Sequence, residues 1–393
     1  MPLAPPLQEI SKPGAQIVAK RDQTLDIFRA VAVLLVVLFH YTARLPQSVF
    51  GTVDHVVPAV SFGWVGVYFF FIISGFCIFF TLERAPTIWT FFAKRFSRIY
   101  PAFAAAAVLL FALDQVFHLP NLPEYFYRES APTMADLLGN LLLLGGIFEW
   151  VNGSFWSITV EVQFYILIGL MAMLVKDGKK LARFFAYTAL AMGIAWMLME
   201  VASADIAVIG KLATGLKKAM IAPYLPFFAL GVVGVQLKEH LKDFSNLFGQ
   251  LAVLSVLIVF LMSGEGEPQL LSVQSTTTAL IVAALIVVFW AYSVGWRMPH
   301  IPLFGSALAH IGLLSFSWYL LHENVGFLLL DALNPTLPYW LSVLVTMATT
   351  YGLAIVFSKV FEWRFRKPAE WIFARTLSIV ARNAPRKLSE GLS

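Results

Sequence analysis

Apolar stretches long enough to cross a lipid bilayer recur along almost the whole chain, and they restrict its fold more than any other feature. A membrane-spanning helix needs about 20 mostly apolar residues, because the hydrocarbon core is ~30 Å thick. Hydrophobic residues make up 59% and charged residues 13% of the 393 positions, whereas a soluble domain has about 25% charged residues. The sequence therefore predicts an all-α, polytopic membrane protein with ten transmembrane helices. The ten stretches lie at roughly 26–46, 59–82, 99–118, 156–175, 181–203, 220–237, 246–263, 276–294, 306–331 and 339–362.

One further apolar segment, at 135–150, decides between ten and eleven spans. It is short and contains Gly139, Gly145 and Gly146. With ten spans and a cytoplasmic N-terminus, 21 of the 28 Lys and Arg residues lie on the cytoplasmic side and 5 in the outer loops. An eleventh span would reverse every later loop and lose this bias. The positive-inside rule therefore favours ten spans with both termini in the cytoplasm, and 135–150 as a re-entrant or interfacial segment.

Composition also divides the chain and limits its partners. We expect a polar cytoplasmic segment at 1–24, a transmembrane domain at 25–368 and a basic cytoplasmic tail at 369–393. The net charge of +5 comes from cations beside apolar spans, so we expect membrane contacts and no nucleic acid. Cys77 is the one cysteine, which excludes an intrachain disulfide. We expect no metal site, because no cluster of metal-ligand residues is apparent, and the sequence does not indicate an oligomeric state.

The first span carries a cation near each end. Arg29 and His40 are eleven positions apart, so on a helix they share a face and lie roughly 16 Å apart along the axis. Ionisable groups inside a membrane are costly and by default indicate function. The alternative is an interfacial arginine that reaches the headgroups, together with a histidine satisfied by a neighbouring helix.

Two more titratable residues are expected at the depth of His40. With ten spans, Glu161 lies near the outer end of the fourth span, and His322 lies towards the outer end of the ninth. We expect His40 to pair with Glu161 or His322, which makes these three residues the candidate catalytic group. The alternative for Glu161 and His322 is interfacial exposure without chemistry.

A basic cluster is expected at the opposite, cytoplasmic end. The segment Lys94-Arg95-Phe96-Ser97-Arg98 leads to Pro101, which is expected to open a helix. Arg95 and Arg98 share a helix face, and with Arg29 they would form a pocket suited to phosphate oxygens. Simple cytoplasmic anchoring is the alternative. The pair Ser74-Gly75 in the second span predicts either a close helix approach or a local break.

Six segments in order resemble acyltransferase family 3, whose members are bacterial integral membrane O-acyltransferases acting on surface glycans. The resemblance extends from about residue 22 to about residue 370. The segments are Leu25-Asp26 with Arg29 and His40; Phe70-Phe71-Ile72-Ile73-Ser74-Gly75-Phe76; Lys94 to Pro101; Phe155-Trp156-Ser157-Ile158-Thr159-Val160-Glu161-Val162-Gln163-Phe164-Tyr165; Ser315-Phe316-Ser317-Trp318-Tyr319-Leu320-Leu321-His322; and the closing Phe361-Glu362-Trp363-Arg364-Phe365-Arg366-Lys367-Pro368.

The resemblance implies a function for these residues. The donor would be a cytoplasmic acyl-CoA, most often acetyl-CoA, used as a co-substrate with no tightly bound cofactor. Arg29, Arg95 and Arg98 would bind its phosphates, and its pantetheine arm would pass Ser74 and Gly75. His40 would act as general base or nucleophile, with Glu161 orienting the imidazole. The expected supporting residues are Asp26, Ser157, Tyr165 and Tyr319.

The acceptor would be a hydroxyl of a glycan or lipid-linked sugar, reached at the outer side of the bacterial inner membrane or, alternatively, at its cytoplasmic side. A transporter of a lipid-linked sugar or polysaccharide intermediate is the competing class. Transporters often contain internal repeats, and we find no repeat between the two halves of this chain.

Overall fold

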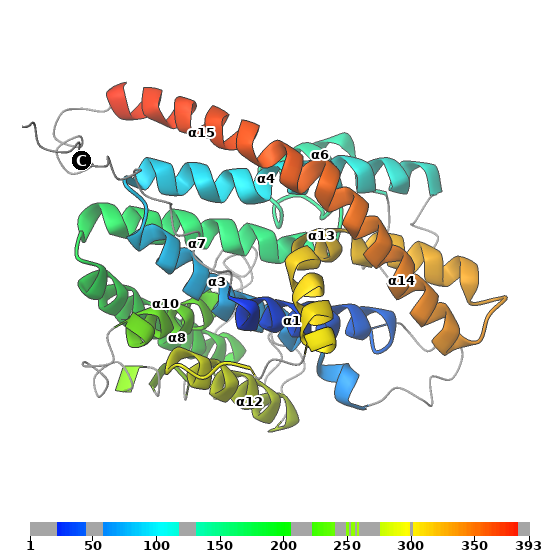
Figure 1. Ribbon diagram of the computed structural model, residues 1–393, viewed down its shortest axis with the longest axis horizontal. Helices are drawn as coiled ribbons and strands as arrows, with labels where there is room; N and C mark the ends of the chain where they lie inside the picture. Colours follow the sequence, from blue (N-terminus) through cyan, green and yellow to red (C-terminus); the bar gives the residue numbers. More distant parts are fainter. Residues whose placement is uncertain are drawn as a thin grey trace, which may run out of the picture.

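The computed structural model describes residues 22–44, 58–117, 131–205, 222–239, 249–250, 253–255, 258, 276–298 and 302–383. The named elements within these ranges are all helical (Figure 1), with one isolated β-bridge between Gly145 and Phe148. The helices are α1 (Gln23–Tyr41), η1 (Pro58–Phe62), α3 (Val65–Glu83), α4 (Ile88–Phe117), α6 (Met134–Leu141), α7 (Phe155–Leu174), α8 (Gly178–Asp205), η3 (Ala222–Tyr224), α10 (Leu225–Glu239), α12 (Thr276–Ser293), α13 (Pro302–Leu333), α14 (Tyr339–Phe357), the π-helical η5 (Ser358–Trp363) and α15 (Arg364–Asn383).

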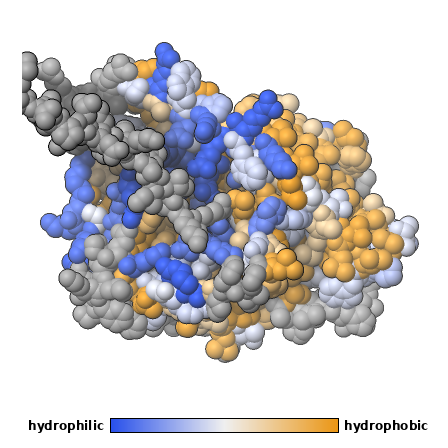
Figure 2. All heavy atoms as spheres, in the orientation of Figure 1, coloured by the Kyte–Doolittle hydropathy of each residue, from blue (hydrophilic) through white to orange (hydrophobic). Residues whose placement is uncertain are grey.

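Six of the described helices are long and apolar enough to cross a membrane, so the protein is an all-helical, multi-pass membrane protein. Two apolar helices, at Ala222–Lys238 and Thr277–Ser293, are shorter. The expected count of ten is not confirmed, and the expected span at 246–263 lies mostly outside the described residues. Figure 2 shows apolar residues gathered over the half of this face where α14 lies, and polar residues over the other half.

The segment 135–150 does not cross the bilayer as a helix. Its helix, α6, has 8 residues and is therefore about 12 Å long. The chain then turns, with positive φ angles at Leu143 and Gly146. The Asn140 side chain closes this turn by donating to the carbonyl oxygens of Asp136 and Glu149, at 2.8 Å each. This geometry fits the re-entrant or interfacial segment that the positive-inside rule favoured.

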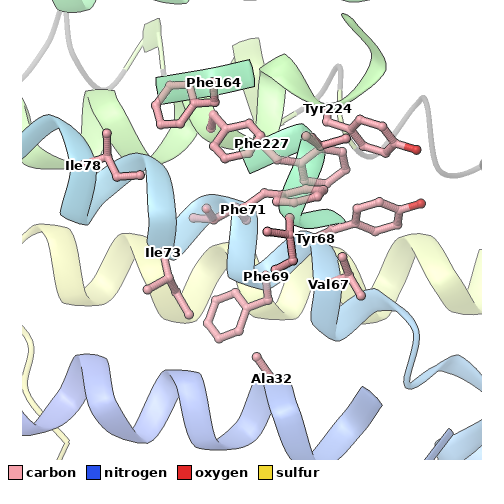
Figure 3. Packing of buried hydrophobic residues seen from close by; sticks show 14 of the residues in the cluster. Ala32, Val67, Tyr68, Phe69, Phe71, Ile73, Ile78, Phe164, Tyr224 and Phe227 are labelled. Carbon is pink, nitrogen blue, oxygen red and sulfur yellow. The ribbon is translucent and has the colours of Figure 1, made fainter. Parts of the chain in front are cut away.

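Helix α3 lies at the centre of the bundle, between α1 on one side and η3 with α10 on the other (Figure 3). Its aromatic side chains stack on the second group, as Tyr68 does on Phe227 at 4.8 Å between ring centroids. A Cβ on Gly75 would lie 2.1 Å from the carbonyl oxygen of Phe228, so Gly75 allows a close backbone approach. Of the two structures predicted for Ser74-Gly75, close approach within an unbroken helix is the one observed.

The expectation that Pro101 opens a helix is wrong. Helix α4 runs from Ile88 to Phe117 with Pro101 inside it. An internal proline costs about 3 kcal/mol. Packing offsets this cost, because Phe373 of α15 lies against Phe96 and Tyr100, at 5.9 and 6.2 Å between ring centroids. Residues 369–383 of the expected tail are accordingly part of a helix packed along α4 (Figure 1).

Candidate functional site

A buried cluster of titratable side chains forms where the C-terminal end of α1 meets α13. The rings of His40 and His322 lie 4.8 Å apart and almost perpendicular, with His322 Nε2 3.4 Å from His40 Nδ1. Glu323 follows on α13, and its carboxylate lies 4.0 Å from His40 Nε2. His40 is 8%, His322 0% and Glu323 1% exposed. We call His40, Arg44, His322 and Glu323 the histidine cluster.

Backbone carbonyls fix the protonation pattern of the two imidazoles. His40 Nδ1 lies 2.8 Å from the carbonyl oxygen of Val36, and His322 Nδ1 lies 2.7 Å from that of Tyr319. A carbonyl oxygen only accepts, so each Nδ1 carries a proton, and in the neutral ring each Nε2 holds a lone pair. His40 Nε2 is therefore free to take a proton, and Glu323 lies where it would stabilise the imidazolium that results.

Glu323 is itself held in place by Arg44. The Arg44 guanidinium donates to Glu323 Oε1 at 2.5 Å. Gly153 makes room for the carboxylate, since a Cβ there would lie 2.5 Å from the same oxygen. The other oxygen, Oε2, is buried and has no hydrogen-bond partner within the described part of the chain. One carboxylate oxygen of Glu323 therefore pairs with Arg44, and the other has no hydrogen-bond partner among the described residues.

The sequence analysis did not identify Glu323 or Arg44 as site residues. Glu323 follows His322 in the chain, but adjacent helical residues point about 100° apart. Identifying His322 therefore did not identify Glu323. A carboxylate inside an apolar span is the signal that would have found Glu323, because such a group defaults to function.

A second polar region, which we call the arginine pocket, lies between α1, α3, α4, α7 and α13. It is an open cavity whose volume, counted with its mouth, is about 640 Å³. Apolar side chains such as Phe70 and Phe316 form part of its wall. Its polar lining residues are Arg29, Ser74, Arg98, Ser157, Glu161, Tyr165, Ser315 and Tyr319.

Glu161 belongs to this pocket and not to the histidine cluster. Its Oε1 accepts hydrogen bonds from Ser74 at 2.6 Å and from Tyr165 at 2.8 Å. Of the two partners expected for His40, the structure places His322 beside it and Glu161 elsewhere. The hydroxyl groups of Ser74 on α3 and Tyr165 on α7 hold Glu161 in the pocket instead.

The three predicted phosphate-binding arginines differ in their partners. Arg29 donates to Asp26 at 2.8 Å and to Cys77 Sγ at 3.0 Å while lining the pocket. Arg95 donates to the Thr81 hydroxyl and lies beside Arg98, outside the lining. Arg98 lines the pocket, and no hydrogen bond or ion pair joins it to another residue in the described ranges.

Tyr319 lies between the two regions. Its hydroxyl is 2.8 Å from Ser157 Oγ and donates to the Ser154 carbonyl at 3.1 Å. Its ring lines the arginine pocket and lies 5.4 Å from the ring of His322. One lining residue of the pocket therefore contacts the histidine cluster. Gly75, predicted to lie along this route, instead packs against α10 and is not part of the lining.

Comparison with known proteins relates the chain to acyltransferases. An O-acetyl transferase of Shigella phage Sf6 is 28% identical over 171 residues, which is 40% of this chain and 48% of the relative. Acyltransferase MdmB of Streptomyces mycarofaciens is 29% identical over 118 residues, 29% of this chain and 30% of the relative. A putative acetyltransferase of Acidianus two-tailed virus is 27% identical over 154 residues, 38% of this chain and 41% of the relative.

These alignments cover less than half the length of each relative. No solved structure matches the chain. The family model described as an acyltransferase domain matches residues 22–359, a range that includes both the histidine cluster and the arginine pocket. Because that match extends over most of the sequence, the chain belongs to acyltransferase family 3.

Proposed function

We propose that the protein is a membrane O-acyltransferase that moves an acyl group, acetyl being the commonest, from acyl-CoA to a hydroxyl of a glycan or glycolipid. Family membership and relatives named O-acetyl transferase and acetyltransferase support the reaction class. The observation that carries the proposal is that the two regions adjoin. The open pocket is lined by Arg29, Arg98 and Tyr319, and the Tyr319 ring lies against His322, which pairs with His40.

The donor occupies the arginine pocket in this proposal. Guanidinium groups form paired hydrogen bonds with phosphate oxygens, and Arg29 and Arg98 supply two of them at the pocket. The pantetheine arm then runs past Ser74 and Glu161, where hydroxyl and carboxylate oxygens can accept from its amide N–H groups. From Arg29 to His40 the rise along α1 is about 16 Å, a distance suited to an extended arm.

At the far end His40 acts on the acceptor hydroxyl. Its Nε2 takes the hydroxyl proton as the oxygen attacks the thioester carbonyl carbon. A C–O bond forms, the C–S bond breaks, and the CoA thiolate leaves and takes up the proton from the imidazolium. Glu323 stabilises that imidazolium during the transfer, which would be its catalytic contribution.

A covalent route uses the same residues. His40 Nε2 attacks the thioester carbonyl and releases CoA, and the acyl-imidazole then passes its acyl group to the acceptor. Both routes use the same two regions, since each requires an unprotonated Nε2 at His40.

The proposal also fixes the sides of the membrane. Acyl-CoA enters from the cytoplasm of a bacterial cell, both termini face the cytoplasm, and the acceptor sugar meets His40 from the outer side of the inner membrane. The charge distribution along the sequence supports this orientation.

The test is acyl transfer by the purified protein in proteoliposomes supplied with acetyl-CoA and a glycan extract. Wild type should release CoA and label the glycan, and His40→Ala should do neither. The matched control is His310→Ala, since His310 is an exposed histidine of α13 bonded to Tyr351, and it should behave like wild type. Movement of glycan without any CoA release would replace this proposal with the transporter function.

A further inference from the structure

Tyr41, the last residue of α1, has no role in the reaction described above, yet it contacts the backbone on either side of the histidine pair. It follows His40 directly, and its hydroxyl donates to the His322 carbonyl oxygen at 2.7 Å. Tyr41 is 0% exposed, and its ring lies 6.5 Å from the ring of His322. One buried side chain therefore joins the two backbone segments that carry the histidines.

The contacts around Tyr41 form a closed ring. The chain passes from His40 to Tyr41, the Tyr41 hydroxyl bonds the His322 backbone, and His322 Nε2 lies 3.4 Å from His40 Nδ1. Each imidazole is also bonded to a carbonyl of its own helix, that of Val36 or Tyr319. A shift of α13 against α1 at this level must therefore stretch the Tyr41 bond. That bond is the one contact in the ring that can be removed without changing an imidazole.

Helix α13 leaves room for the phenol ring of Tyr41. A Cβ on Gly326, four residues beyond His322, would lie 2.3 Å from the Tyr41 hydroxyl oxygen. The ring thus packs directly against the α13 backbone, in an interior that is too densely packed to let it move aside.

Helix α14 holds Tyr41 from a third side, although it contributes no described residue to the lining of the arginine pocket. The Tyr339 hydroxyl donates to the Tyr41 carbonyl oxygen at 2.9 Å. Thr350 Oγ1 accepts from the Tyr41 hydroxyl at 3.2 Å. Both the backbone and the hydroxyl of Tyr41 are therefore bonded to α14.

Thr350 is a buried acceptor for the Tyr41 hydroxyl. It is 0% exposed, and its own proton is donated to the Thr346 carbonyl at 2.8 Å. Its Oγ1 also accepts from Trp318 Nε1 at 3.0 Å. Because its proton is already donated, Thr350 can only accept from Tyr41, and the phenol proton is shared between Thr350 and the His322 carbonyl.

We propose that Tyr41 is a positioning residue that sets the spacing between His40 and His322, and that Thr350 orients its hydroxyl. This inference rests on the proposed function for what the histidine pair does. A base that is displaced by a fraction of an ångström transfers protons less well, whereas the donor binds in a pocket that Tyr41 does not line. Loss of the Tyr41 hydroxyl should therefore lower kcat without weakening donor binding.

The experiment compares kcat with the Kd for acetyl-CoA, measured without acceptor, for the full-length protein in proteoliposomes. Tyr41→Phe keeps the ring and removes the hydroxyl, so kcat should fall about tenfold while Kd stays within about twofold. Thr350→Val should lower kcat several-fold, and Thr350→Ser, which keeps the hydroxyl, should restore it. The double variant Tyr41→Phe with Thr350→Val should be no slower than Tyr41→Phe alone, because both changes act through one hydroxyl.

Two residues of α14 supply matched controls. Tyr351→Phe also removes a phenol hydroxyl bonded to α13, but its partner is the exposed His310, at 2.7 Å. Thr349→Val changes the exposed neighbour of Thr350. Both should match wild type. An unchanged kcat in Tyr41→Phe overturns the inference, and so does a parallel loss of kcat, donor binding and melting temperature, which a merely structural role would give.

A second readout requires no turnover. Heteronuclear NMR of the ring nitrogens, with signals assigned by replacing His40 and His322 singly, should show both imidazoles shifted in Tyr41→Phe and neither in Tyr351→Phe. Unmoved signals in Tyr41→Phe overturn the positioning role. A wild type that transfers no acyl group, together with shifted signals in Tyr41→Phe, would refute the proposed function and leave the positioning role standing.

Discussion

The histidine cluster and the arginine pocket both contain residues of α1 and α13, but they differ in how their charges are paired. In the cluster, His40, His322 and Glu323 are at most 8% exposed, and Arg44 is bonded to Glu323. A charge buried in this way is tolerated only with a partner. In the pocket, Arg98 is partly exposed and has no ion pair within the described ranges. The cluster is organised before any substrate arrives, whereas the pocket presents a charge for a ligand to complete.

Helices α1 and α13 keep these two regions in register. At the pocket end, a Cβ on Gly312 would lie 1.7 Å from the Asp26 carbonyl oxygen, so the two backbones are almost in contact. At the cluster end, the Tyr41 hydroxyl donates to the His322 carbonyl at 2.7 Å. This rigid pair of helices therefore keeps the donor-binding residues apart from the catalytic residues. If so, donor binding and catalysis can be changed separately by mutation.

The largest effect is expected in the cluster, for Glu323→Gln. Loss of the carboxylate charge leaves the imidazolium without its partner, so kcat should fall by about 10²–10³-fold, within the range for acid–base groups. The Kd for CoA should not change, because Glu323 does not line the pocket. Single-turnover kinetics and equilibrium binding give the two numbers. Glu149→Gln, at an exposed glutamate, is the control, and parallel losses of kcat and binding would refute the separation.

A companion variant separates rate from stability in the cluster. Replacing Glu323 alone also breaks the ion pair between its buried carboxylate and the partly exposed Arg44, and loss of such a pair lowers stability. The double variant Arg44→Met with Glu323→Gln should regain thermal stability while kcat stays low. Recovery of kcat together with stability would mean that Glu323 acts only through folding.

In the pocket the expected effect is smaller, and it changes donor binding instead of kcat. Arg29→Gln should raise the Kd for CoA about 10- to 50-fold, in line with loss of a charged hydrogen bond, while kcat at saturating donor stays within about threefold. Binding by wild type should also weaken as salt is raised, since phosphate contacts are screened. The measurement is donor titration at two ionic strengths, and an unchanged Kd in Arg29→Gln would remove the phosphate role of Arg29.

A third change, Gly312→Ala, should impair both regions at once. Gly312→Ala places a methyl group against the Asp26 carbonyl and forces α13 away from α1, an overpacking that costs about 1–3 kcal/mol. Both donor binding and kcat should fall several-fold, together with the melting temperature in detergent. Gly352→Ala is the control, because a Cβ there meets nothing within 4 Å. A defect confined to one region would show that the helices do not act as one frame.

The smallest effect concerns Asp22, which caps α1 outside the membrane. Burial raises its pKa, but the Tyr292 hydroxyl, donating at 2.7 Å, and the cations of Lys238 and Arg297 outweigh burial and hold the pKa below 3.8. A lowered folded-state pKa contributes stability above the unfolded value, and that stability is lost as pH falls through the folded one.

Asp22→Asn should therefore lower the free energy of unfolding at pH 7 by less than about 1 kcal/mol, because the group is partly exposed, and this should appear as a small drop in melting temperature. The difference from wild type should disappear as the pH falls through the lowered pKa of Asp22 in the folded protein. Asparagine is also a good N-cap, so the cap is kept and only the charge changes. A difference that persists at low pH would point to the cap instead.

Much of this arrangement could be predicted from the sequence, because the apolar stretches and the spacing along α1 are local features. Arg29 and His40 share α1 as expected, and 135–150 contains only a short helix. What failed depended on contacts between distant segments. Pro101 stays inside α4 because α15 packs there, and Glu161 lies in the pocket because Ser74 and Tyr165 bond it. Positions along single helices could not show that Glu161 lies in the pocket and His40 in the histidine cluster.

Vectorial transfer tests the central claim most directly, because the account places donor and acceptor at opposite ends of α1. Acetyl-CoA with a labelled acetyl group is sealed inside proteoliposomes, and the glycan acceptor is supplied only outside. We expect labelled external glycan with wild type and none with His40→Ala, while Arg29→Gln should regain the wild-type rate at high internal donor. Labelling only when donor and acceptor share one compartment would contradict it.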